Sequence, residues 1–420
     1  MSLAPTMDHN ARSSVTVAVG KSKATLNLPA WQAQELPHAK RTLVTWQPQT
    51  AVSASNFGGA YVEYLINPND IDTIQELWLQ VGLGAASQTG GSSLYFSSDL
   101  SFMIKQVDLV SNGSSETLFS LQGAGLVSYI KNVLTLPYDD RVLLFNNNAN
   151  GSSSTRTTLA ASAGMYLLPI FVPPLTLGAK NGGFLNAASA GWRVRIYFDS
   201  LGNWLYANGT APSVALNSAT LLGVGKNIVD QAAKSRSVVA IKKSPAQIKY
   251  PVFNSMLTYA LASGSTTYNV TLSSIVGPAA FLWFTVRTAS NVTTSYSALP
   301  DTFTSIASVQ LVTASGTNIL PQGFTHAYMV GPQAMTLWTG DLTDNNHTSP
   351  MSIYCIPFAS DVESFIKNGQ YDGHYTFTGT EQLQITFTSS LGSASVLDVV
   401  AGVQALAQQD PATGIVRRIQ

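Results

Sequence analysis

The amino-acid sequence predicts an all-β protein built from two similar halves in tandem. Short apolar runs rich in β-branched and aromatic residues are separated by Gly, Asn and Ser clusters, which is the pattern of many short strands joined by turns. Helical periodicity is scarce, and several apolar segments recur in one order along the chain. A length of 420 residues is ample for two domains.

Individual strands are predicted from period-two alternation and from short apolar runs. Residues 193–198 and 382–387 alternate polar and apolar side chains, so that every second residue of a strand would face a core. Further strands are expected at 60–66, 76–83, 102–110, 268–272 and 280–286. Short helices are expected at 124–134, 226–234 and 396–409, and long solvated loops at 146–162 and 290–300.

The internal repeat consists of four ordered pairs of segments. Residues 104–111 and 306–313 share the pattern Ile-x-x-Val-x-Leu-Val followed by a hydroxyl residue. The other pairs are 77–79 with 282–284 (both centred on tryptophan), 165–171 with 351–358, and 193–198 with 382–387. Because all four matches keep one order, a shared β-rich composition does not explain them, and we infer a structural duplication.

A Gln-Gly pair followed by a tyrosine comes after the Ile-x-x-Val segment in both halves. The first half has Gln122-Gly123 and Tyr129, and the second has Gln322-Gly323 and Tyr328.

The junction between the halves is expected near residue 240. Residues 235–251 are polar and basic and contain two prolines, which is typical of a linker. We therefore expect an N-terminal arm at 1–40, a first domain at 41–240, and a second domain at 241–420 that ends in a short tail.

The charge content favours self-association over free diffusion. The chain has 22 Lys plus Arg and 22 Asp plus Glu, and only 10% of its residues are charged, against about 25% in a typical soluble protein. A net charge near zero removes the repulsion that keeps copies apart. Because basic and acidic residues are equal in number, the chain lacks the excess of positive charge that is typical of nucleic-acid-binding proteins, and no sequence-specific nucleic-acid binding is expected. The N-terminus has no apolar segment typical of a secretion signal, and no apolar run is long enough for a transmembrane helix.

The sequence shows no catalytic constellation, so we expect no enzyme activity, no catalytic residues, no cofactor and no metal. A single cysteine, Cys355, excludes an intrachain disulfide and a cysteine-rich metal site. No two of the five histidines have ligand spacing, and no GxSxG or phosphate-loop motif occurs. The glycines of 178–183 are interpreted as a turn.

Acidic pairs are the remaining candidates for chemistry. Asp70 and Asp72 could ligate a cation, but a solvated turn after Pro68 with capping or hairpin duty explains them better. Asp139-Asp140 is expected to cap a turn, and residues 361–363 to lie solvated beside a helical turn.

Basic residues are unevenly distributed along the chain. Residues 231–300 contain no acidic side chain. One interpretation is simple solvation or local ion pairing, and the sharper one is a basic end of the subunit that faces anionic lipid or genome. The residues proposed for that inner face are Arg12, Lys21, Lys23, Lys40, Arg41, Lys242, Lys243, Arg417 and Arg418.

Taken together, the pattern resembles the double jelly-roll major capsid proteins of tailless, membrane-containing phages and of large DNA viruses. The resemblance rests on the apolar blocks at 167–171 and 353–358 and on the strands that begin at Ile104 and Ile306, and it covers most of 55–405. It implies two tandem eight-stranded jelly-roll β-sandwiches with a few short helices. The loops between strands look too short for elaborate outer towers.

The resemblance also implies a function and partners. Homotrimers of pseudo-hexagonal outline would tile an icosahedral virion shell, over an internal membrane. The partners would be other copies of the chain, minor capsid and vertex proteins, and that membrane; the protein would be made in the host cytoplasm. The alternating stretch 14–28 would belong to an arm that reaches neighbours or the membrane.

Two other classes of function remain open at this point. A carbohydrate-binding or adhesive pair of β-sandwiches would need an exposed aromatic platform, for which Trp192 and Trp204 are candidates. A hydrolase on a β scaffold would need an acid/base pair, for which only Asp70 and Asp72 offer themselves.

Overall fold

The computed structural model describes most of the chain. The described residues are 6–7, 14–19, 22–27, 39–97, 99–136, 160–176, 184–243, 247–253, 257–288, 303–320, 323–340, 352–369 and 372–419. The loop expected at 290–300, almost all of the loop at 146–162, and the Asp139-Asp140 pair lie outside them.

The first half forms two four-stranded antiparallel sheets. One has the order β11-β6-β15-β4 and the other the order β10-β9-β12-β5. In chain order the strands are β4 (Ala39–Trp46), β5 (Val62–Ile66), β6 (Thr73–Leu83), β9 (Ile104–Ser111), β10 (Thr117–Gln122), β11 (Gly164–Pro169), β12 (Trp192–Phe198) and β15 (Leu216–Ile228). Strand β12 alternates buried and half-buried side chains throughout, as its sequence predicts.

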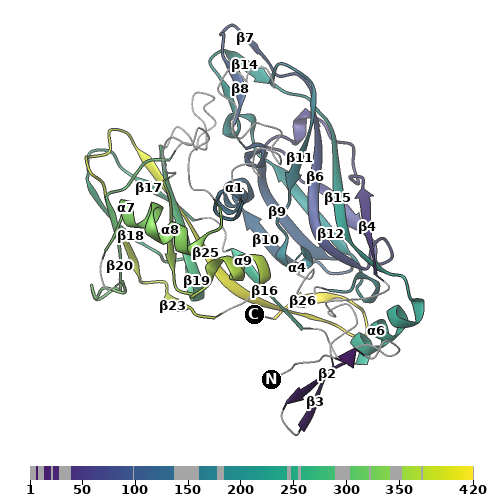
Figure 1. Ribbon diagram of the computed structural model, residues 1–420. Coiled ribbons are helices and arrows are strands. Elements are labelled where there is room, and N and C mark those ends of the chain that lie inside the picture. The colour runs from purple at the N-terminus through teal and green to yellow at the C-terminus, as the bar shows by residue number, and fades with distance from the viewer. Residues whose placement is uncertain are drawn as a thin grey trace.

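A small projection extends from one end of this first sandwich. Strand β7 (Ser87–Thr89) pairs with β14 (Thr210–Ser213), and β8 (Leu94–Phe96) pairs with β13 (Leu205–Ala207). Figure 1 shows these ladders at the top of the molecule, beyond the ends of the main sheets. The loops that join β6 to β9 and β12 to β15 are therefore more structured than the sequence predicts.

The second half repeats the same architecture. Its sheets have the orders β16-β25-β19-β22 and β18-β24-β20-β21, with β17, β23 and β26 attached to the first of them. The main strands are β16 (Gln247–Phe253), β18 (Thr267–Thr271), β19 (Val276–Thr288), β20 (Ser308–Val312), β21 (Phe324–Thr325), β22 (Ile353–Pro357), β24 (Gln382–Thr386) and β25 (Ser395–Gln409). The attached strands are β17 (Leu257–Leu261), β23 (Tyr375–Thr378) and β26 (Val416–Arg418).

When the eight main strands of each half are numbered in chain order, the strands with the same number occupy the same position in the sheets of the two halves. This agreement confirms the duplication. The four matched sequence segments fall on β6 and β19, β9 and β20, β11 and β22, and β12 and β24. Even the register agrees: Leu109 pairs with Val194 in the first half, and their counterparts Leu311 and Leu383 pair in the second. Each half is thus an eight-stranded jelly roll, and the two stand side by side (Figure 1).

The predicted helices have mixed outcomes. Helix α1 (Ala124–Thr135) lies where the sequence predicts it. Helix α6 (Gln231–Lys243) begins later than the expected 226–234, because residues up to Ile228 still belong to β15. The other helices of the described chain are short: α4 (Pro173–Thr176), α7 (His326–Val330), α8 (Pro332–Leu337) and α9 (Val362–Asn368), with one-turn 3-10 helices at Ala54–Asn56, Leu100–Met103, Asn186–Ala188 and Leu201–Asn203.

The helix expected at 396–409 is wrong. This segment is β25, the longest strand of the second sandwich, which pairs with β16, β17, β19 and β26. Its alanines and glutamines favour a helix in isolation, but most of its residues are buried and none is exposed, and tertiary packing overrides that weak local preference.

The connection between the two halves is short and helical. Among the described residues, every strand from β4 to β15 pairs within 39–228, and every strand from β16 onward pairs within 247–418. Helix α6 occupies the intervening stretch. The domain bounds 41–240 for the first jelly roll and 241–420 for the second stay a prediction.

The described parts of the N-terminal segment form a sheet of their own. Strands β1 (Thr6–Met7), β2 (Ser14–Val19) and β3 (Ser22–Asn27) pair only with one another. Its role as an arm stays a prediction.

Candidate assembly surfaces

The outer face of the sheet β16-β25-β19-β22 forms the contact between the two jelly rolls. Trp283, Phe253 and Phe281 stack together on this face, and all three are fully buried. Phe171, which follows β11 of the first jelly roll, places its ring 5.1 Å from that of Phe253. Phe253 of the second sandwich is thus in contact with the first, while Phe281 and Trp283 also pack on Phe365 and Trp338 of their own half.

A buried ion pair lies on the same face. Arg287 Nε donates to Asp398 Oδ2 at 2.6 Å, and the two side chains are only 5% and 1% exposed. Asp199 of the first jelly roll is close enough for the charge of Arg287 to act on it, although burial still raises its pKa above the ordinary value. The pair is therefore shielded from water where the two halves meet.

Helix α1 fills the gap between the two sandwiches. The ring of Tyr129 lies 6.1 Å from that of Phe303 in the second half, and Tyr129 is only 3% exposed. At the end of the helix, the Gly340 amide donates to the Leu134 carbonyl at 2.9 Å. Nearly all of α1 is buried, because one side packs on its own jelly roll and another side on the second.

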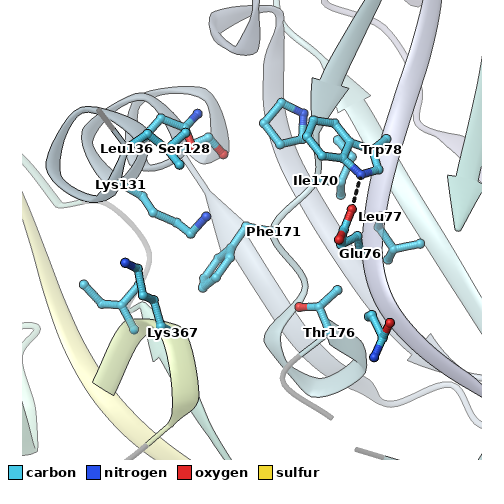
Figure 2. A pocket seen from close by; sticks show the side chains of 14 residues that line it. Glu76, Leu77, Trp78, Ser128, Lys131, Leu136, Ile170, Phe171, Thr176 and Lys367 are labelled. Carbon is cyan, nitrogen blue, oxygen red and sulfur yellow. Dashed lines mark hydrogen bonds between the residues drawn. The ribbon is translucent and has the colours of Figure 1, made fainter. Parts of the chain in front are cut away.

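A cavity of about 290 Å³ remains at this contact. Figure 2 shows Lys131 of α1 and Lys367 of α9 approaching it from the two halves, with Phe171 beside them. The Lys131 ammonium lies 5.1 Å from the centre of the Phe171 ring. Burial, helped by the charge of Lys367, lowers the pKa of Lys131 to about 8.

Both acidic residues of the candidate cation site take part in hydrogen bonds within the fold. Asp70 accepts hydrogen bonds from Trp46 Nε1 at 2.8 Å and from the Asn67 amide at 2.9 Å, as a turn residue does. Asp72 is buried rather than solvated: it accepts from the Ile228 amide and forms an ion pair with Lys234 at 2.7 Å. Asp72 therefore anchors helix α6 to the first jelly roll.

The other candidate residues have structural surroundings. Within the described ranges, no group of three or more His, Cys, Asp or Glu side chains is placed to hold a metal ion. Cys355 is buried, and burial raises its pKa well above the ordinary value. Asp361 caps α9 by accepting from the Ser364 amide at 2.7 Å.

The exposed aromatic platform expected for a carbohydrate-binding protein does not form at the proposed residues. Trp192 and Trp204 are both 0% exposed, and the Trp192 indole donates to Asn186 at 2.7 Å. In the described part of the chain, no helix has the length and apolar character needed to cross a membrane.

Six of the residues proposed for a basic inner face lie on elements at one end of the molecule. Lys40 and Arg41 open β4 opposite the end of β15, after which α6 carries Lys242 and Lys243 in its last turn. Arg417 and Arg418 lie on β26. Figure 1 shows α6 and β26 at the lower end of the molecule. All six side chains are exposed. Arg12 and Lys21 lie outside the described residues, and Lys23 lies in β3.

Ion pairs account for part of the acid-free stretch at 231–300. Lys234 pairs with Asp72 and Arg287 with Asp398, so both cations have carboxylate partners from distant parts of the sequence. For these two residues the alternative interpretation, ion pairing, therefore holds, with partners that are distant in sequence but adjacent in space.

Solved structures of viral capsid proteins share this fold. VP54 of PBCV-1, fitted into a reconstruction of the virophage Sputnik, superposes with a TM-score of 0.65 at 12% identity, over 91% of this chain and 97% of that one. The Faustovirus major capsid protein gives 0.59 at 10% identity, over 88% and 90%. The mavirus major capsid protein gives 0.54 at 12% identity, over 90% of each chain.

No protein-family model and no curated protein sequence matches the chain, and the likeness to these capsid proteins comes from the comparison of structures. It extends over nearly the full length of both partners and includes both halves. The protein has the double jelly-roll fold of viral major capsid proteins.

Proposed function

We propose that the protein is the major capsid protein of an icosahedral virus, assembling as homotrimers of pseudo-hexagonal outline that tile the shell. One observation carries the proposal: a single chain holds two jelly rolls of identical strand order side by side. Three such chains around a threefold axis supply six similar sandwiches, and six similar units fill a hexagon. The fold shared with capsid proteins of several viruses supports the same function.

The low charge of the chain suits this function. With 10% charged residues and no net charge, copies repel one another weakly, and broad polar contacts between them desolvate few ions. The partners are first other copies of the chain, then minor capsid and vertex proteins. The protein belongs to the virion and is made in the host cytoplasm.

Electron microscopy tests the proposed assembly. Negative-stain images of the purified protein should show particles of hexagonal outline, alone or in plates and shells. Isolated particles with two lobes and no higher order at high protein concentration would contradict it.

The basic end is proposed to face inward, toward an internal membrane. Each lysine near an anionic bilayer contributes about 1 kcal/mol, which is a factor of about five in affinity. Lys243→Gln should therefore weaken sedimentation with phosphatidylserine vesicles about fivefold. Lys105→Gln, at an exposed position on β9, is the control and should change it little. Equal losses for both variants, or equal binding to uncharged vesicles, would contradict the inward orientation.

A further inference from the structure

The outer face of the first jelly roll has the same strand register as the contact face of the second. In the first half, Trp78 of β6 pairs with Leu222 of β15, and two residues further along β15, Val224 pairs with Leu43 of β4. Leu43 is therefore fixed in position relative to Trp78 by two sheet pairings.

The second half contains the corresponding set of residues. Trp283, the counterpart of Trp78 in the repeat, pairs with Val400 of β25, and two residues further along, Gly402 pairs with Phe253 of β16. Leu43 thus occupies the position in the first jelly roll that Phe253 occupies in the second. Phe253 is fully buried against the first jelly roll, whereas Leu43 is 64% exposed.

Two more exposed apolar side chains lie on the same face as Leu43, on the opposite edge strand of the sheet. Met165 and Leu167 of β11, in the same sheet, are 52% and 36% exposed. A monomeric protein seldom exposes several large apolar side chains on one face of a sheet. We define this surface by Leu43, Met165 and Leu167 and call it the sheet face.

A second apolar surface lies where the second jelly roll would contact a further sandwich. Tyr328 of α7 is the counterpart of Tyr129 of α1, since each follows the Gln-Gly pair of its half. Tyr129 is 3% exposed in the contact between the halves, but Tyr328 is 45% exposed. Met335 of α8, seven residues later, is 85% exposed. We call Tyr328 and Met335 the helix surface.

We propose that the helix surface of one copy packs on the sheet face of a second copy, and that this contact repeats between chains the contact seen within the chain. Each surface has a buried counterpart in the contact between the two halves, so the partner is another copy of the same chain. Figure 1 shows α7 and β4 on opposite flanks of the molecule. Two different surfaces on opposite flanks make a head-to-tail contact, which closes a ring when the rotation allows it.

This inference rests on the proposed function and names the surfaces that perform it. Leu43→Glu removes the sheet face and leaves the helix surface intact, and Met335→Glu does the reverse. Each variant alone should lower the mass measured by light scattering from the trimer to 44.6 kDa. Mixing the two variants should restore one contact per pair of chains and give about twice 44.6 kDa.

Val276→Glu is the matched control, because Val276 is 65% exposed but belongs to neither surface. It should leave the trimer unchanged. The recovered contact in the mixture also shows that both variants are folded. Trimers that persist in Leu43→Glu or Met335→Glu, or a mixture that stays monomeric, would overturn the assignment of surfaces while leaving self-assembly in place. An unmodified protein that is monomeric would contradict the proposed function itself.

Discussion

The ion pair between Arg287 and Asp398 offers a quantitative test of how tightly the two jelly rolls are joined. Asp398→Asn is nearly isosteric but removes the negative charge, and it leaves Arg287, which is 5% exposed, without its ion-pair partner. Removing one partner of a buried pair costs about 3–5 kcal/mol, because an uncompensated charge remains in a medium of low dielectric. We expect Asp398→Asn to lower the free energy of unfolding by that amount.

Urea unfolding, followed by tryptophan fluorescence, measures the loss. Glu63→Gln is the matched control: Arg195 and Glu63 also lie 2.7 Å apart, but their side chains are 22% and 23% exposed. Water replaces the lost partner there, so the expected loss is below about 1 kcal/mol.

A double variant separates charge from packing. Arg287→Met with Asp398→Leu removes both ions and keeps apolar volume, so it should recover most of the stability lost in Asp398→Asn. If Asp398→Asn costs no more than Glu63→Gln, the pair is not shielded from water, and the close contact between the jelly rolls described above is wrong.

Two further substitutions test the packing of the fold. Lys131→Met should raise the free energy of unfolding at pH 7 by about 3 kcal/mol, because the folded chain holds a lysine whose pKa is lowered from 10.5 to about 8. Between about pH 8 and 10.5 the unfolded state binds a proton that the folded state does not, so the unmodified protein becomes more stable as pH rises. The stability gained through Lys131→Met should therefore shrink over that range. Urea titrations in which this gain stayed constant would refute the reasoning. Gly225→Ala should cost about 1–3 kcal/mol, since its Cβ would lie 1.8 Å from the Thr73 carbonyl oxygen, whereas Gly392→Ala meets nothing within 4 Å and should be neutral in the same assay.

The duplication could be predicted from the sequence because equivalent strands keep equivalent apolar patterns. The segments that begin at Ile104 and Ile306 both line a core, so each needs buried residues at the same spacing. Alternation located β12 and β24 closely for the same reason: one face of each strand is buried and the other is not.

Features that depend on tertiary contacts could not be predicted in this way. Strand β25 was expected as a helix because nothing local reveals that four strands surround it. Asp72 looked like a turn residue, yet its partner Lys234 is 162 residues away in sequence. The projection formed by β7, β8, β13 and β14 consists of strands of three or four residues, too short to show alternation.

The candidate surfaces were partly visible in the sequence. The matched tryptophans, Trp78 and Trp283, and the matched tyrosines, Tyr129 and Tyr328, are apparent from the repeat. Which member of each pair is buried within the chain is not, because burial depends on which neighbour is present. The difference in exposure between Leu43 and Phe253 could be found only from the strand register.

The mass of the purified protein in solution tests the central claim most directly. Light scattering at micromolar concentration should give three times 44.6 kDa, the mass of a homotrimer with six jelly rolls. A mass of 44.6 kDa that persists as concentration rises would contradict the account, because two jelly rolls alone cannot complete a hexagonal unit.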